Sequence, residues 1–159
     1  MGRKKLILIS AAVSVFIIMA YVILGVFALP ESDFPMGPAP ENPIGVTIDV
    51  IGADNASLTV RLTQSGGEPT GRLQYGTYYW IETLYRNGKW YRLRPQSNAA
   101  FTLEAYQLNL GSQRDYDVTF SGRYGKLAPG TYRFCMEIMD FREAGDYTDY
   151  PCFAEFSVE

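Results

Sequence analysis

The sequence predicts an all-β protein, a sandwich of about seven or eight antiparallel strands that follows one N-terminal transmembrane helix and a proline-rich linker. Two observations between residues 44 and 159 predict the sandwich. Short segments of alternating apolar and polar residues recur with turn signals between them, and no segment keeps a helical period. A third observation, a single uncharged run before this region, predicts the membrane helix.

The first 29 residues are typical of a membrane anchor. Residues 1–5 form a basic cytoplasmic tail, and residues 6–29 carry no charge over 24 positions. A helix of that length spans about 36 Å, enough to cross about 30 Å of hydrocarbon. Basic residues before the run and acidic residues after it favour a single-pass protein with its C-terminal part outside the cell. The alternative is a signal peptide cleaved near Ala28, which would release a secreted protein.

Residues 30–43 have the composition of a linker, with five prolines and three acidic residues among 14 positions. This composition favours an extended spacer that holds the next part of the chain clear of the bilayer. A disordered tether fits it equally well. Residues 44–159 then have the size of one domain.

Turn signals separate the strands expected in this domain. Asn87-Gly88 predicts a β-hairpin, and Pro129-Gly130 predicts a turn before the longest strand. A single helical turn is the alternative for residues 101–106. The expected strands are residues 46–50, 58–62, 78–86, 89–94, 105–110, 114–120, 132–138 and 150–158.

The stretch from Leu127 to Tyr132 is typical of one kind of sandwich. A leucine, a Pro-Gly turn and then a tyrosine that enters a long strand are similar to the tyrosine corner of immunoglobulin-like domains. The fold class is therefore expected to be an immunoglobulin-like β-sandwich.

Further motifs over nearly all of residues 44–159 carry a family resemblance. They are Gly45-Val46-Thr47, residues 63–67, Pro69-Thr70-Gly71, residues 73–76, Gly88-Lys89-Trp90, Glu104-Ala105-Tyr106, residues 124–127, residues 129–133, Met139-Asp140-Phe141 and Ala154-Glu155-Phe156. Together they resemble the bacterial immunoglobulin-like (Big-type) domains of membrane-anchored and lipoprotein-like surface proteins in Gram-positive anaerobes. The resemblance implies a fold and a surface location, but no catalytic residues and no ligand. The chain departs from that pattern in its cysteine pair and in lacking a lipid-attachment cysteine.

The hairpin at Asn87-Gly88 supplies a candidate binding surface. A two-residue turn would place Tyr85 opposite Trp90 and leave Tyr85, Trp90 and Arg92 on one solvated strand face. Aromatic rings beside an arginine could stack on sugar rings or anchor a protein partner. The alternatives are that the pair only stabilises the hairpin, or that this face is the buried one.

Cys135 and Cys152 form a candidate disulfide. A four-residue loop at 142–145 would pair the two cysteines across the last two strands, close enough for a bridge in an oxidising exterior. The strand faces conflict, because Cys135 shares a face with polar residues and Cys152 with apolar ones. A bulge near Ala154 would reconcile them, and two free buried thiols are the alternative.

Composition argues against several other functions. The chain has no histidine and no nucleophile-elbow or phosphate-binding motif, so we expect no enzyme, no cofactor and no metal. Residues 30–159 hold 11 basic and 17 acidic side chains, a net charge of −6 that argues against nucleic acid. Four carboxylates near the last hairpin fit no EF-hand spacing, and solvated charge explains them; they are Asp140, Glu143, Asp146 and Asp149.

The predicted function is a membrane-anchored, extracytoplasmic module for protein interaction or surface structure, with a protein or cell-wall partner. One alternative is a carbohydrate-binding module that uses the hairpin aromatics. Another is an inhibitor or regulator of a surface protease, acting through the loops at residues 64–71 and 95–100.

Overall fold

The computed structural model describes residues 29–32, 42–97, 100–102 and 104–159. The chain divides into two units, Met1–Pro30 and Glu31–Glu159, and the second holds nearly all of the described residues. The basic tail and, apart from Leu29, the predicted transmembrane segment 6–29 lie outside the described residues. Within the described part of the chain, no helix is long and apolar enough to cross a membrane.

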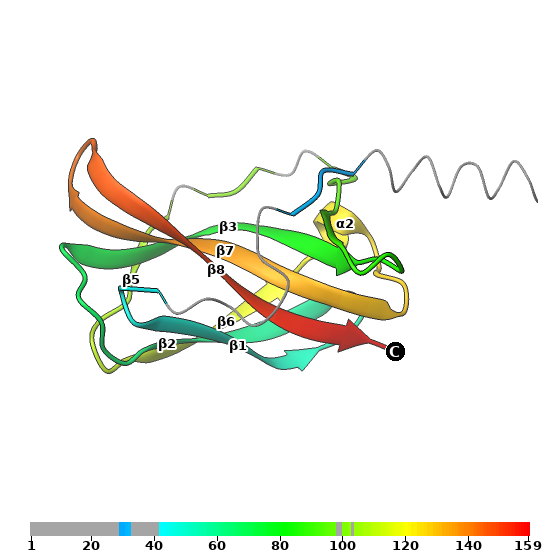
Figure 1. Cartoon of the computed structure of the whole chain (residues 1–159), viewed down its shortest axis with the longest axis horizontal. Helices are drawn as coiled ribbons and strands as arrows, with labels where there is room; N and C mark the ends of the chain where they lie inside the picture. Colours follow the sequence, from blue (N-terminus) through cyan, green and yellow to red (C-terminus); the bar gives the residue numbers. More distant parts are fainter. Residues whose placement is uncertain (1–28, 33–41, 98–99, 103) are drawn as a thin grey trace, which may run out of the picture. The chain divides into compact units, whose positions relative to one another are not determined.

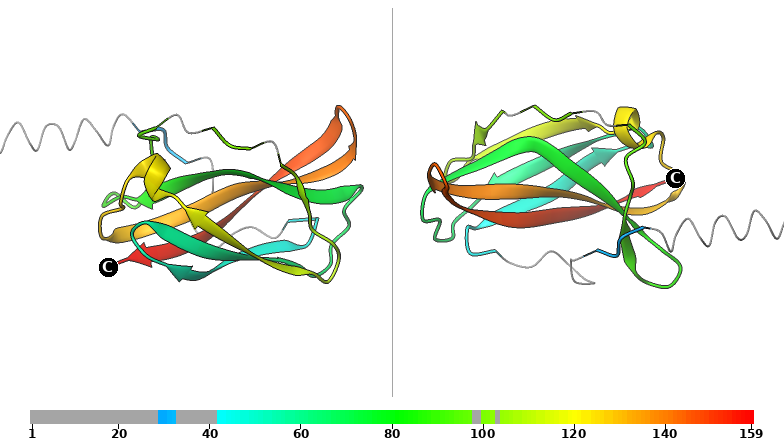
Figure 2. Two further views of the ribbon diagram at one scale, coloured as in Figure 1. Left: turned by 180° about the vertical axis from the view of Figure 1, so that it is seen from behind. Right: turned by 90° about the horizontal axis from the view of Figure 1, so that it is seen from above.

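The strands between Val46 and Val158 form two antiparallel sheets, which Figure 1 shows as two layers. One sheet has the strand order β1-β2-β6, and the other has the order β4-β3-β7-β8, with β5 paired to β3. The β7–β8 hairpin extends beyond the other layer at one end (Figure 2). The elements are β1 (Val46–Ala53), β2 (Ser57–Gln64), β3 (Arg72–Leu84), β4 (Trp90–Arg92), β5 (Tyr106–Gln107), β6 (Gln113–Thr119), α2 (Ser121–Tyr124), β7 (Gly130–Glu143) and β8 (Asp146–Val158).

The core between the layers is built from the alternating apolar residues of the strands. In β2 these are Leu58, Val60 and Leu62, and in β7 they include Phe134 and Ile138, all at most 3% exposed. Within each strand these residues are separated by an even number of positions, so a single face of each strand supplies them. The faces predicted from the alternation in these two strands are confirmed.

The corner at the start of β7 is present as predicted. The hydroxyl of Tyr132 donates a hydrogen bond to the carbonyl oxygen of Ala128 at 2.7 Å, across the Pro129-Gly130 turn. Leu127 is buried, and its backbone N–H donates to the carbonyl of Asn55 at the β1–β2 turn. These bonds fix the entry of β7 into the sandwich.

Several elements differ from the expected ones: β5 is shorter, β7 and β8 both extend farther toward their hairpin, and two further differences have a local cause. Strand β3 begins at Arg72 rather than at residue 78, because Leu73 and Tyr75 already point into the core. Its alternation is hidden by a bulge, where the pairing with β7 shifts between Tyr75 and Tyr79. The described positions of 101–106 contain no helical turn; the short helix is α2, after β6.

The predicted linker, residues 30–43, is partly bound to the sandwich. Glu31 bridges Tyr91 in an antiparallel sense, and its carboxylate pairs with Lys89 at 3.0 Å. The N–H of Ser32 donates to the carbonyl of Trp90 at 2.9 Å. At the other end of the linker, the side chain of Asn42 bonds both the N–H and the carbonyl of Val46. The described ends of this segment are therefore parts of the folded unit rather than a free spacer.

The loop between β2 and β3 is packed closely against the start of β1. Gly45 and Gly67 both have positive φ, +66° and +76°. A Cβ atom on Gly67 would overlap the backbone of Ile44 and Gly45, and one on Gly45 would overlap the backbone of Gly66 and Gly67. Only glycine fits both the conformation and the space.

We predict that Gly67→Ala destabilises the fold far more than Gly111→Ala. Gly111 has a similar φ of +71°, but a Cβ there meets no atom within 4 Å. Gly111→Ala should therefore cost only the backbone term, about 1–2 kcal/mol. Overlap should raise the cost of Gly67→Ala to about 3–5 kcal/mol. Urea unfolding of the two variants measures the difference, and equal losses would contradict the close packing.

Asp140 is a buried carboxylate that fastens β7 to the start of β3. Its side chain is about 1% exposed. One oxygen accepts hydrogen bonds from the N–H and hydroxyl of Thr70 at 2.7 and 2.8 Å, and the other accepts one from the N–H of Gly71 at 2.6 Å. Burial by itself raises the pKa of Asp140, but these bonds and the nearby Arg142 outweigh it and hold the pKa below its usual value. The prediction that Asp140 is a solvated charge was wrong.

We predict that Asp140→Asn lowers the free energy of unfolding by about 1.5–3 kcal/mol at neutral pH. The asparagine NH2 group would replace one carboxylate oxygen and face the N–H donors of Thr70 or Gly71, with which it cannot form a hydrogen bond. Because the folded-state pKa is lowered, the contribution of the carboxylate is complete above about pH 4 and is lost as the pH falls through that pKa. Urea unfolding of both proteins between pH 7 and pH 3 should show the difference in unfolding free energy narrowing with acid. A difference independent of pH would contradict an ionised, hydrogen-bonded Asp140.

Candidate interaction surface

The β3–β4 hairpin has a different register from the predicted one. The N–H of Tyr85 donates to the carbonyl of Lys89, which leaves a three-residue loop that ends at Gly88 with a φ of +77°. Leu84 therefore pairs with Trp90, and the predicted pairing of Tyr85 with Trp90 was wrong. A shift of one residue turns each side chain to the other face of the sheet.

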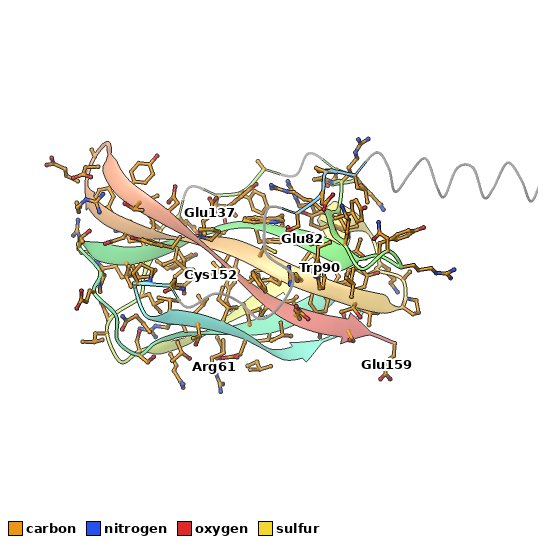
Figure 3. All side chains as sticks on the ribbon, viewed as in Figure 1. Arg61, Glu82, Trp90, Glu137, Cys152 and Glu159 are labelled. Atoms are coloured by element: carbon orange, nitrogen blue, oxygen red, sulfur yellow. The ribbon has the colours of Figure 1, made fainter. Side chains whose placement is uncertain are left out.

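Trp90 is buried on the outer face of the five-stranded sheet, at 5% exposure. The guanidinium of Arg133 lies between two rings, 4.0 Å from the centroid of Trp90 and 4.1 Å from that of Phe153. Arg133 itself is fully buried and bonds the carboxylate of Glu155 at 3.0 Å. Figure 3 labels Trp90 beside Glu82 in this part of the sheet. Trp90 is thus a packing residue.

The other two predicted surface residues are held by their own neighbours. Tyr85 is half-buried, and its ring meets the ring of Tyr91 edge-on at 6.3 Å. The guanidinium of Arg92 lies 4.7 Å from the ring of Trp80 and donates to the hydroxyl of Tyr78. Tyr85, Trp90 and Arg92 therefore do not form one solvated patch.

Cys135 and Cys152 are both free and buried. Strand β7 pairs Cys135 with Phe153 and Met136 with Cys152, because a bulge near Arg142 shortens the loop that was expected to span 142–145. Cys135 packs with Trp80 on the outer face, whereas Cys152 belongs to the core between the sheets. The predicted register was wrong, and the two thiols lie on opposite faces of the sheet.

Burial protects both thiols from ionising. It raises the pKa of Cys152 to about 12, against the partial effect of a hydrogen bond from Asn42. It also raises the pKa of Cys135 well above its usual value, and Glu82 adds to that effect. Neutral buried thiols of this kind are unreactive.

The same outer face carries an open groove farther along β7, which we call the acidic tyrosine groove. It has a volume of about 300 Å³ and lies over the bulge in β3. Its floor includes Met139, and its walls come from β3, β7, β8 and the segment before β5. Figure 3 shows Glu137 nearer than Glu82 to the β7–β8 hairpin. The residues that characterise the groove are Tyr78, Glu104, Glu137, Met139, Tyr147 and Asp149.

Two tyrosines leave much of their rings open to solvent at this groove. Tyr78 is 40% exposed and Tyr147 is 50% exposed. Beside the groove, Tyr106 stacks at a tilt on Tyr75 and donates its hydroxyl to Glu104. An exposed tyrosine in a concave site can contribute both an apolar ring and a hydroxyl to ligand recognition.

The charged residues that line the groove are all acidic. None of its described lining residues is a lysine or an arginine. Burial raises the pKa of Glu137, the charge of Asp149 raises it further, and Arg92 acts in the opposite direction. No salt bridge between described residues includes Glu104, Glu137 or Asp149.

Carboxylates near the last hairpin and the two loops predicted to act on a protease make contacts within the domain. Asp146 pairs with Arg142, and no group of three carboxylate or thiol ligands suited to a metal occurs among the described residues. In the loop at 64–71, Ser65 and Glu68 donate backbone hydrogen bonds to Gly45 and Pro43. The described part of the loop at 95–100 is tied down by bonds from Gln96 and Ser97 to residues 122–123.

Sequence reasoning did not find the groove. Glu137 and Met139 alternate with core residues of β7. This alternation places their side chains on the outer face of the sheet, but it does not show which residues of other strands lie beside them. Pairing then places Met139 beside Asp149, and the bulge in β3 opens the space beside Tyr78. The tyrosines of β3 and β8 were the only sequence feature that could have indicated the groove. The strand register, which the sequence did not reveal, brings them to the same site.

Two antiparallel sheets with a tyrosine corner define an immunoglobulin-like sandwich. Residues 42–156 match a family model described as bacterial Ig-like domain, so the chain belongs to that family. No curated protein and no solved structure gives a significant match.

We predict that Trp90→Ala destabilises the sandwich by about 3–5 kcal/mol, because it removes a buried ring that packs against Arg133. Tyr85→Ala is the matched control from the same hairpin and should cost about 1 kcal/mol. Urea unfolding followed by intrinsic fluorescence measures both. A Trp90→Ala protein as stable as the Tyr85→Ala protein would mean that Trp90 is not a packing residue.

Proposed function

We propose that this chain is a membrane-anchored, extracytoplasmic Ig-like module that acts by binding another protein. Membership of the bacterial Ig-like domain family supports a structural or interaction role. The uncharged run at residues 6–29, with basic residues before it and acidic residues after it, supports the anchor and its orientation.

The observation that carries the interaction role is the acidic tyrosine groove. Much of the remaining outer face around it is filled by its own side chains, such as Trp80 and Phe153, which are at most 7% exposed. In the groove, by contrast, Tyr147 is 50% exposed and Tyr78 is 40% exposed, although the ring of Tyr78 also meets that of Phe101 edge-on. Tyrosine is enriched in protein interfaces because it combines a large apolar ring with a hydroxyl.

We predict that a C-terminal epitope on the full-length chain stays with the membrane fraction and is digested when protease is added to intact spheroplasts. Positively charged residues determine this orientation, so reversing the charges of Arg3, Lys4 and Lys5 together should protect part of the epitope. An epitope found in the medium would favour cleavage near Ala28, and an epitope fully protected in the wild type would contradict the orientation.

A second candidate function is carbohydrate binding, and the exposed rings of Tyr78 and Tyr147 are the observation that favours it. Stacking on sugar rings needs open aromatic faces rather than charge. The buried Trp90, which was the centre of the predicted carbohydrate site, no longer supports it.

A further inference from the structure

The outer face of the five-stranded sheet repeatedly places an arginine on an aromatic ring. Arg133 lies between Trp90 and Phe153, and Arg92 lies over Trp80 at 4.7 Å. Such contacts are favourable because the negative face of the ring attracts a cation, and more so where water is excluded. Arg133 shows the complete arrangement, two rings and the carboxylate of Glu155 around one guanidinium.

The acidic tyrosine groove has similar surroundings, and none of its described lining residues is a lysine or an arginine. It presents the rings of Tyr78 and Tyr147, and carboxylates from two adjacent strands in Glu137 and Asp149. Strand pairing places Glu137 opposite Pro151, and Asp149 opposite Met139, so the two carboxylates are diagonal neighbours on one face. A positive group between them would relieve their repulsion and gain charge-assisted hydrogen bonds.

One arginine borders the groove and is already bound by residues of the sheet. Arg92 donates to the hydroxyl of Tyr78 and covers Trp80, and it does not line the groove. The groove, at about 300 Å³, has room for a long side chain and the backbone beside it. Both its charge and its rings therefore complement a cationic group carried on a polypeptide.

We propose that the acidic tyrosine groove binds a basic side chain, lysine or arginine, of a protein partner. The carboxylates of Glu137 and Asp149 receive the charged head, and the rings of Tyr78 and Tyr147 cover the aliphatic stem and the cation. This inference rests on the proposed interaction role and gives the chemical class of its partner.

The test uses the full-length chain in detergent micelles and a hexa-lysine peptide, with isothermal titration calorimetry at fixed salt. The same peptide with every lysine acetylated is the matched ligand control, because it keeps the backbone and length but has no side-chain charge. We expect binding of hexa-lysine and at least about tenfold weaker binding of the acetylated peptide.

Matched variants separate the groove from the general negative charge of the domain. Glu137→Gln with Asp149→Asn should weaken hexa-lysine binding about tenfold. Glu143→Gln with Glu159→Gln makes the same change in net charge at exposed positions outside the groove and should change it less than about twofold. Tyr147→Ala should weaken binding several-fold through loss of a ring. Each variant should keep the thermal midpoint of the wild type.

Three outcomes would overturn the inference. They are equal losses in the two double variants, no heat of binding with hexa-lysine, or a glycan pelleting assay in which retention depends on Tyr147 while hexa-lysine does not bind. The last outcome would favour carbohydrate. A chain that passes the membrane-orientation test but binds no hexa-lysine keeps the proposed location and loses this inference.

Discussion

The structure depends on the register of β7 against its two neighbours. Both faces of this strand are buried, with Phe134 and Ile138 toward the other sheet and Arg133 and Cys135 on the outer face. A slip of one residue would place Arg133 in the apolar core, which is costly for a charge. The Tyr132 corner at one end and the bulge near Arg142 at the other fix this register. The central strand therefore tolerates only one pairing.

That register divides the outer face into a closed part and an open part. In the closed part, arginines supplied by the chain fill the space between aromatic rings, as Arg133 does beside Trp90. In the open part, the bulge in β3 removes a stretch of pairing and leaves Glu137 and Tyr147 around a groove. In the closed part, a cation from the chain itself packs on an aromatic ring, as Arg133 does on Trp90. We propose that in the groove the corresponding cation comes from a partner. The proposed interaction role rests on this open part of the outer face.

The closely packed loop before β3 is bonded to β7 at Asp140, next to the groove residue Met139. Asp140 binds the backbone of Thr70 and Gly71, and Gly71 lies so close to the carbonyl of Phe141 that no larger residue fits. These bonds hold β3 and β7 together beside the bulge, where regular pairing is interrupted. Rigid support of this kind would reduce the entropy cost of the binding proposed at the groove.

The sequence by itself determined the fold class, the core face of β2 and β7, and the tyrosine corner, because alternation and turn chemistry are local properties. It placed most strands but lost the first half of β3, where the bulge hides the alternation. Only the tertiary structure decided which outer residues meet. Both predicted hairpin registers were wrong for one physical reason: a turn that differs by one residue exchanges the faces of a strand, as it did for Trp90 and for Cys135 with Cys152. Loop length and bulges are set by the packing of whole sheets, and so the groove became visible only in the folded chain.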